Sequence, residues 1–274
     1  MAVATRVSRR PSPVLAGSAA VVAAWVVCAA FWPDLVPYDP DLQAPADRFL
    51  PPGTDHWLGT DHYGRDVLSR LVAGARPVLV VAPLAALLSV AAGTALGLLA
   101  GAVRGWFDGL VMRLLDAVVV FPVIIAAVLF IALLGRSAPV LVLVIAAAFV
   151  PLVTRSVRAA TLVEREKPYV EAARLRGEPL WSLVARELLP NVRGTVLVEA
   201  TTRLGDAVFA AATLSFLGLG QPPGSPDWGS SVADNRLWVQ LAPWTVLAPA
   251  LAIGSLVVAV ALLTDRLRRR LDRS

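Results

Sequence analysis

Residues 77–101 read PVLVVAPLAALLSVAAGTALGLLAG, a stretch without one charged side chain. A helix rises about 1.5 Å per residue, so a helix of this length crosses the ~30 Å hydrocarbon core of a bilayer. Gly93, Gly97 and Gly101 recur at four-residue spacing and predict a face of small residues, for close packing against another helix or for a subunit interface. The stretch therefore indicates a membrane-spanning helix.

Five further apolar segments accompany this one, over residues 14–32, 116–134, 138–153, 195–219 and 244–263. A spanning helix needs about 17–25 residues, and only the segment 138–153 is shorter. The chain is 57% hydrophobic and 16% charged, which leaves too little polar surface for a soluble protein. We therefore expect an all-α membrane protein with six transmembrane helices.

The first apolar segment and three prolines lead to two further expectations. The first segment follows basic residues, as a signal peptide does, but its apolar run is long and no clear cleavage site follows, so we expect an uncleaved span. Pro122, Pro151 and Pro249 lie in or beside spans and are expected to kink them, because a proline removes a backbone donor.

The arginines indicate which way the chain runs. Of the 25 basic residues, 18 fall in segments on the N-terminal side of the membrane, including Arg6, Arg9 and Arg10, and six fall on the opposite side. Cytoplasmic loops carry the excess of basic residues, so both termini are predicted to be cytoplasmic. Because this topology also explains the net charge of +5, we expect no nucleic-acid partner.

The inside stretch, residues 154–194, predicts two short helices joined at a glycine. Residues 169–176 carry an acid early and bases late, which suits the helix dipole. Gly177 adopts positive φ without strain and fits the helix end. Pro179 suits the first turn of a second helix, which we expect to end near Pro190. Its apolar face, among charges of both signs, favours docking on a protein over docking on lipid.

This stretch resembles the EAA loop of binding-protein-dependent ABC importer permeases. The resemblance rests on Glu171-Ala172-Ala173, then Gly177, then Leu188-Leu189-Pro190-Asn191. In that family the loop forms coupling helices that sit in a groove of the ATPase subunit. The resemblance therefore implies that these eight residues couple this chain to a separate ATPase.

Three other segments are similar to the dipeptide, oligopeptide and nickel permease group of that family. They are HWLGTDHYGRDVLSRLVAGAR at residues 56–76, GWFDGLVMRLLDAVVVFP at 105–122 and LSFLGLG at 214–220. The long loop after the first span resembles the C-type member of the paired permeases. The resemblance implies a type I ABC importer permease fold, with peptides as cargo, or alternatively nickel or another small solute.

The same resemblance implies partners and a division of the chain. The partners are a second permease subunit, two ATP-binding subunits, an external solute-binding protein and the lipid of the cell membrane. Residues 1–32 would be the cytoplasmic N-terminus and first span, 33–76 an external loop and 77–264 the permease core. The core would hold the coupling loop 154–194, and residues 265–274 would form a basic tail.

The fifth span departs from the family pattern. Ala211 stands where family members commonly carry a glutamate, and the span holds Glu199, Arg203 and Asp206 instead. At i,i+4 and i,i+3 spacing these three can pair along one helix face. Ionisable residues in a span face a cavity or the bundle interior. Either they form a structural pair near the cytoplasmic end, which we favour, or they touch the translocation path.

Several chemistries are not expected in this chain. The sole lysine, Lys167, follows no glycine loop, so ATP binding is excluded and the energy comes from a partner or a gradient. No catalytic arrangement is evident, so we expect neither an enzyme nor a cofactor. His56 and His62, with Asp55 and Asp61, are suitable ligand types, but no helix aligns them, so we expect no metal site.

Two other classes of transport protein remain as alternatives. A gradient-driven secondary transporter is expected to carry inverted repeats and broken helices, and no clear repeat is visible. An ABC exporter or a structural membrane subunit would not need a platform for a solute-binding protein.

Overall fold

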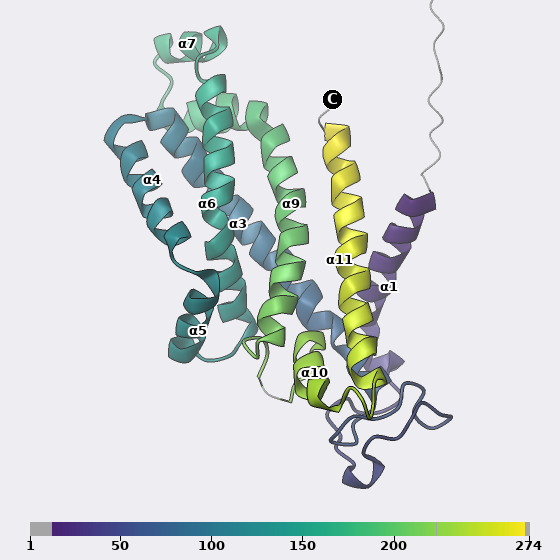
Figure 1. Ribbon diagram of the computed structural model, residues 1–274. Coiled ribbons are helices and arrows are strands. Elements are labelled where there is room, and N and C mark those ends of the chain that lie inside the picture. Colours follow the sequence, from purple (N-terminus) through teal and green to yellow (C-terminus); the bar gives the residue numbers. More distant parts are fainter. Residues whose placement is uncertain (1–12, 223, 272–274) are drawn as a thin grey trace, which may run out of the picture.

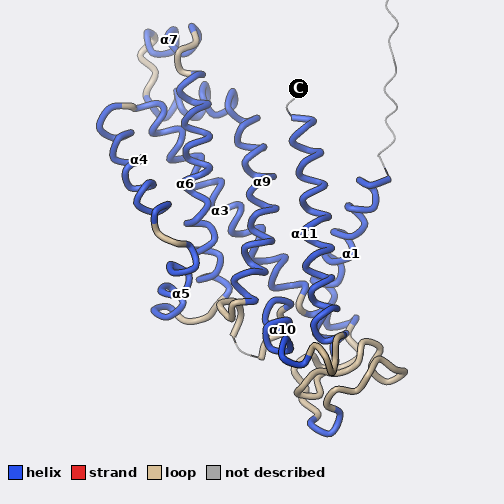
Figure 2. Tube along the Cα trace, in the orientation of Figure 1, coloured by secondary structure: helices blue, strands red, loops and turns tan. Residues whose placement is uncertain are grey.

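The computed structural model describes residues 13–222 and 224–271, and it consists of helices joined by loops (Figures 1 and 2). No strand occurs among the described residues, and Thr60 and Asp66 form an isolated bridge. The long helices are α1 (Pro13–Leu35), α3 (Ala75–Val103), α4 (Gly105–Val120), α5 (Val123–Leu134), α6 (Ala138–Glu164), α9 (Leu189–Phe216) and α11 (Trp244–Leu271). The short elements are η1 (Pro45–Asp47), α2 (Val67–Ala73), α7 (Pro168–Leu175), α8 (Leu180–Ser182), η2 (Leu183–Leu188), α10 (Trp228–Asn235) and η3 (Arg236–Trp238).

The helices α3 and α6 form the centre of the bundle, and the glycines of α3 set how closely they approach. A Cβ built on Gly93 would lie 2.6 Å from the Cβ of Val153, and one on Gly97 would lie 2.8 Å from the Thr154 carbonyl oxygen. At Gly101 the nearest atom, in Thr161, would be at 2.7 Å. The predicted close packing is confirmed, and the helix that packs against this face is α6 of the same chain.

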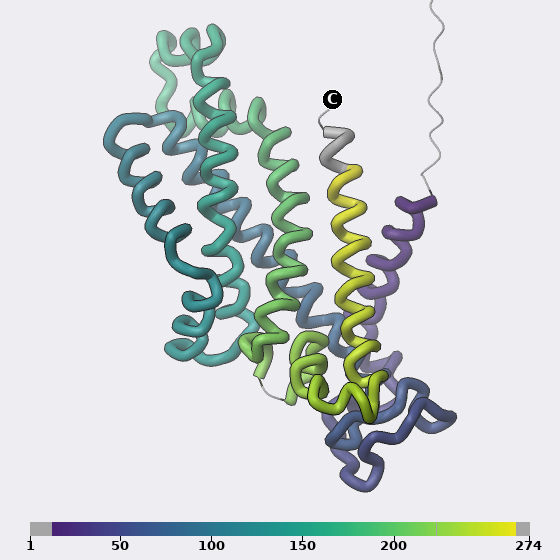
Figure 3. The backbone as a smooth tube through the Cα atoms, in the orientation of Figure 1, coloured from purple at the N-terminus to yellow at the C-terminus, as the bar shows by residue number. Residues whose placement is uncertain are grey.

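The two ends of the described chain lie side by side. Figure 3 shows α1 and α11, at the purple and yellow ends of the trace, next to one another. The Trp25 Nε1 donates a hydrogen bond to the Ser255 hydroxyl at 2.9 Å, and the Trp25 ring meets the Trp228 ring edge-on at 4.6 Å. In Figure 1, α7 lies at the same end of the bundle as the start of α1 and the end of α11, and α10 lies at the other. We call these the α7 end and the α10 end.

The prediction of an all-helical membrane protein is confirmed, with four or five candidate spans among the described residues. Four stretches are long and apolar enough to cross a bilayer: Pro13–Leu35, Val67–Val103, Ala138–Glu164 and Trp244–Arg266. The pair of α4 and α5 makes a fifth if the two count as one span. The 28-residue α9 is not among them, and it carries the three charges noted above.

The third predicted span, residues 116–134, is wrong as a continuous helix. The chain is bent by 88° between α4 and α5. Phe121 and Pro122 both take extended backbone angles, with ψ of 122° at each. Because proline crowds the residue before it out of the helical region, α4 ends there. Pro151 and Pro249 lie inside α6 and α11, which continue through them.

The helix that contains the fourth predicted span does not end where that span meets the predicted inside loop. The helix α6 continues past Val153 to Glu164, so residues 154–164 belong to a long helix. Its charged side chains Arg155 and Arg158 pair with Asp116 and Asp108 of α4, each at 2.5 Å. These ion pairs stabilise the helix beyond its apolar part.

Other predicted segments also differ from the observed helices. The second short helix does not end near Pro190, because α8, η2 and α9 follow one another without a break from Leu180 to Phe216. A π-helical stretch precedes Pro190, and its i→i+5 pattern fits a proline that has no N–H to donate. Likewise α11 extends to Leu271, into the predicted tail, and α2 lies inside the predicted loop 33–76. Residues 1–12 and 272–274 of the predicted termini lie outside the described part.

Candidate functional site

The short helix α7 is built by local signals. Pro168 occupies its first turn, Glu171 lies in that turn and Arg174 in the last, which matches the helix dipole. At its end the Gly177 N–H donates to the Arg174 carbonyl at 2.9 Å and the Glu178 N–H to the Ala173 carbonyl at 3.2 Å. With φ of +76° at Gly177, this is a Schellman cap. The predicted helix followed by a hinge glycine is confirmed.

One face of α7 is part of the protein core. Val170 and Ala173 are fully buried, and they join a cluster with Leu98 of α3, Val157 of α6 and Leu188 of η2. Apolar contacts of this kind fix an element to its neighbours at native packing density. The cluster therefore fixes the position of α7 relative to α3 and α6, the two central helices.

Polar contacts at the root of α7 tie it to the same two helices. The Tyr169 hydroxyl donates to Glu164 at 2.8 Å, and burial together with this carboxylate raises the pKa of Tyr169. The Arg165 guanidinium donates to the carbonyls of Gly101 and Ala102, at 2.9 and 3.1 Å, and so satisfies carbonyls at the end of α3. Burial lowers the pKa of Arg165, although the group stays charged.

The opposite face of α7 and the segment after it are exposed, and they carry apolar side chains among charged ones (Glu171, Arg174 and Arg176). The Leu175 side chain is 83% exposed, and Trp181 is 64% exposed with Arg186 stacked over its ring at 5.5 Å. Glu171 and Ala172 lie on the exposed side as well. Exposed leucine and tryptophan side chains are apolar surface available for contact.

The predicted coupling residues divide between these two faces. Ala173 and Leu188 are buried. The others are exposed: Glu171, Ala172, Gly177, Leu189, Pro190 and Asn191. The Asn191 amide donates to the Glu187 carbonyl at 2.6 Å, at the start of α9. The eight residues lie on α7, in the turn after it, in η2 and at the start of α9, and Ala173 and Leu188 meet in one buried cluster.

The three charges of the fifth predicted span form one linked group on α9. Arg203 Nε lies 3.1 Å from Glu199 Oε2, and Arg203 Nη1 lies 2.6 Å from Asp206 Oδ2. The pairing expected from the spacing is present. Arg203 also lies over the Phe149 ring of α6, at 5.6 Å from its centre.

The α10 end holds a second polar cluster, in which the histidines already have partners. His56 Nδ1 lies 2.9 Å from Asp66 Oδ1, and His62 Nδ1 lies 2.8 Å from the Asn235 side-chain oxygen. Among the described residues no group of three metal-ligating side chains comes together.

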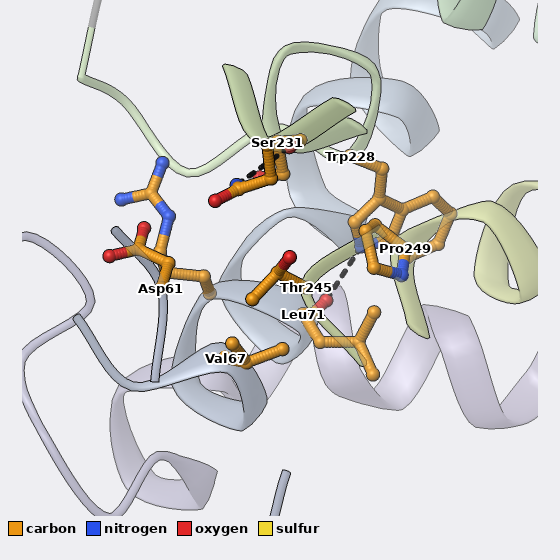
Figure 4. Close-up of a pocket in the computed structure, with 9 residues that line it drawn as sticks. Asp61, Val67, Leu71, Trp228, Ser231, Thr245 and Pro249 are labelled. Atoms are coloured by element: carbon orange, nitrogen blue, oxygen red, sulfur yellow. Dashed lines mark hydrogen bonds between the residues drawn. The ribbon is translucent and has the colours of Figure 1, made fainter. Parts of the chain in front are cut away.

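Trp228 lies at the centre of this end. Figure 4 shows Trp228 of α10 donating a hydrogen bond to the Leu71 carbonyl, at 2.7 Å, beside Thr245 and Pro249. Trp228 is 1% exposed, so this contact fastens α10 to α2 within the core.

Fold and site together define the class of this protein: a helical, membrane-embedded transport component with a short helix, α7, that exposes one face at the end of the bundle. The chain belongs to the family of binding-protein-dependent transport system inner membrane components, whose model matches residues 93–274. It is therefore a transport subunit of the inner membrane, and its family is a non-catalytic one.

Known proteins support this placement. The chain is 38% identical to the glutathione transport system permease protein GsiD of Pectobacterium atrosepticum, over 90% of this chain and 83% of that protein. It is 36% identical to the dipeptide transport system permease protein DppC of Alkalihalophilus pseudofirmus, over 92% and 83%. The fold is similar to a chain of the inward-facing MetNI methionine ABC transporter, with a TM-score of 0.60 over 74% of this chain and 96% of that chain, at 19% identity.

Sequence reasoning missed the side chains that hold α7 in place. Arg165 and Tyr169 have no motif, and their partners lie on other elements. It also missed the cavities beside α9, because Phe149 and Phe209 read as ordinary lipid-facing or core residues. The one available signal was the polar residues that recur along α9.

Proposed function

We propose that this chain is a pore-forming permease of an ATP-driven importer for small peptides. Six spans would cross the membrane, counting α9 and the bent pair of α4 and α5, with the α7 end and both termini in the cytoplasm. The observation that supports the proposal is the two-faced α7: one face packs in a cluster with α3 and α6, and the other is exposed, with Leu175 among charged side chains. The relatives whose names include dipeptide and glutathione transport support peptides as the cargo.

The element consisting of α7 and its capping turn would couple ATP use to the pore. A separate ATPase would bind the exposed face around Leu175 and Trp181. When two ATPases close on ATP, they would pull this element, and the buried cluster would pass the movement to α3 and α6. Such coupling requires only that the two pore conformations bind the ATP-bound ATPases with different affinity.

The proposal extends to the other partners. A second, different permease subunit would complete the pore, since the relatives named DppC and GsiD resemble the C-type member of a pair. An external solute-binding protein would deliver the peptide at the α10 end. The chain itself would hold no cofactor and no metal.

The decisive experiment replaces Leu175 with aspartate in the complex expressed with its second permease, ATPases and binding protein. A charge in an apolar contact is costly, so Leu175→Asp should lose the co-purifying ATPase and ATP-dependent uptake of a labelled dipeptide, with membrane insertion unchanged. Leu237→Asp is the matched control for co-purification of the ATPase, because Leu237 is 81% exposed but lies at the α10 end, away from α7. An unchanged amount of bound ATPase in Leu175→Asp would contradict the coupling role. Uptake of other solutes, but of no peptide, would contradict the cargo.

A further inference from the structure

The helix α9 carries a stripe of partly exposed residues that is unusual for a membrane-spanning segment. Thr202, Asp206, Phe209 and Thr213 follow one another at four-, three- and four-residue spacing, so they share one face of the helix. The Asp206 side chain is 46% exposed. A carboxylate in contact with hydrocarbon is costly, and such groups face a cavity or a water-filled path.

The depth of Asp206 points to the middle of the membrane. Asp206 lies ten residues before Phe216, where α9 ends at the α10 end. At about 1.5 Å per residue this is about 15 Å, half of a hydrocarbon core of ~30 Å. With Phe216 at the membrane surface, the carboxylate would lie near the midplane, where a charge requires a cavity or a polar partner.

Two cavities meet at this side chain. One, of about 430 Å³, lies between α5, α6 and α9 and is mostly apolar, with walls that include Ile124, Phe149 and Phe209. The other, of about 340 Å³, lies between α9 and α11, and its walls include Thr202, Thr264 and a second carboxylate, Asp265. Asp206 and Phe209 belong to both. A largely apolar pocket with a few polar or charged groups is the usual form of a small-molecule site, and here the charged groups are both carboxylates.

The group of Glu199, Arg203 and Asp206 contains two negative charges and one positive charge. Arg203 serves both Glu199 and Asp206, so two carboxylates share one guanidinium. Arg203 and Glu199 are only 13% and 14% exposed, whereas Asp206 opens to the cavities. The surplus negative charge is therefore presented at Asp206, and a cation with hydrogen-bond donors is the ligand that it fits.

We propose that Asp206 binds the ammonium group of the cargo during its passage, while the cavity at Phe149 and Phe209 receives the adjacent side chain. This inference rests on the proposed peptide import, since a peptide carries an ammonium at its N-terminus or on a lysine. Asp206 thus acts as a specificity-determining residue in the translocation path. A basic side chain of the second permease is the competing occupant, and the test separates the two.

The test measures uptake by the full transporter of a dipeptide with a free N-terminus and of its N-acetylated form. A lysine-containing N-acetylated peptide forms a third arm, and all three are first shown to bind the isolated solute-binding protein. Asp206→Asn should lower uptake of the free-amine peptide about ten-fold, because a charge-assisted hydrogen bond is lost, and leave the acetylated peptide without lysine nearly unchanged. Asp206→Glu should keep most of the uptake. If only the peptide with a free N-terminus loses uptake, the bound group is the N-terminal ammonium. If the lysine-containing acetylated peptide loses uptake as well, the lysine ammonium is also bound.

The control is Asp116→Asn, which removes a carboxylate paired with Arg155 outside both cavities. The inference would be overturned if Asp206→Asn took up each peptide, free-amine and acetylated, at the wild-type rate. The proposed function would stand in that case. A wild-type complex that binds its ATPases but moves no peptide would instead refute the proposed function.

A second measurement tests the inference if the transporter with Asp206→Asn does not assemble. In a Cys28→Ala background, Thr213→Cys should react with a water-soluble thiol reagent in the assembled transporter, and transported peptide should slow the reaction. Leu143→Cys, exposed on α6 outside both cavities, should not react. An unreactive Thr213→Cys, or one that cross-links to the second permease, would overturn the inference.

Discussion

Gly177 shows how far one residue determines a local structure. Its φ of +76° is disfavoured for any residue with a Cβ, and no other atom lies within 4 Å of the position that a Cβ would take. The requirement at this position is therefore one of backbone conformation and not of space. The sequence could predict it, because a glycine after a helix pattern is itself the signal.

Replacing Gly177 tests this distinction. Gly177→Val should cost about 1–2 kcal/mol in the local cap, because valine avoids the left-handed region, and should lower ATP hydrolysis stimulated by the solute-binding protein. Gly177→Asn should keep most of the stimulation, since asparagine tolerates that region. Gly109→Ala, at an open position inside α4, is the control. Equal stimulation in Gly177→Val and the wild type would contradict the role of the cap.

At the scale of the element, the glycines of α3 let α6 pack closely against it, because they carry no side chain. The four-residue spacing of the glycines predicted a packing face, and the structure identifies the facing helix. The spacing could not identify it, because a small face accepts any helix that approaches closely. The choice of α6 depends on Val153, Val157 and Thr161, which fill the space above the glycines.

Adding a methyl group to this interface is predicted to force the two helices apart. A Cβ on Gly97 would lie 2.8 Å from a backbone oxygen, which cannot rotate away. Gly97→Ala should therefore lower the free energy of unfolding by about 1–3 kcal/mol, as overpacking does. Thermal unfolding of the purified complex, followed by tryptophan fluorescence, measures it. Gly254→Ala, which meets nothing within 4 Å, should show no loss, and an equal shift in both variants would contradict the prediction.

At the scale of the whole molecule, Arg70 fastens together segments that are far apart in the sequence. Its guanidinium, 4% exposed, donates to the carbonyls of Pro40, Gly224 and Ser225 at 2.9, 3.1 and 2.9 Å. The loop after α1 and the loop before α10 are thereby joined at the α10 end. The proposed binding-protein surface thus depends on one buried arginine.

Replacing Arg70 with lysine keeps the charge but removes the planar fork that reaches three carbonyls. We expect Arg70→Lys to leave at least one carbonyl unsatisfied, at a cost of about 1–3 kcal/mol, and to speed protease cleavage of residues 36–66. Limited proteolysis of the transporter in proteoliposomes, with this side outward, measures the rate. Arg76→Lys, at an exposed position, is the control. Equal cleavage rates in all three proteins would show that Arg70 does not hold the loops.

The sequence by itself determined the features that depend on neighbouring residues alone. These are the apolar segments, the expected sidedness from the arginines, and the helix with its hinge glycine at Gly177. Each follows from local hydropathy, local charge or the backbone preference of one residue type.

Only the tertiary structure decided how far each helix runs and which side chains meet. The 88° bend between α4 and α5, the continuation of α6 to Glu164 and the cavities around Asp206 all depend on contacts between distant segments. Pro122 signalled a kink, but not its size. The physical reason is that a helix continues past its apolar part when ion pairs and packing on other helices stabilise it, and those contacts are absent from the local sequence.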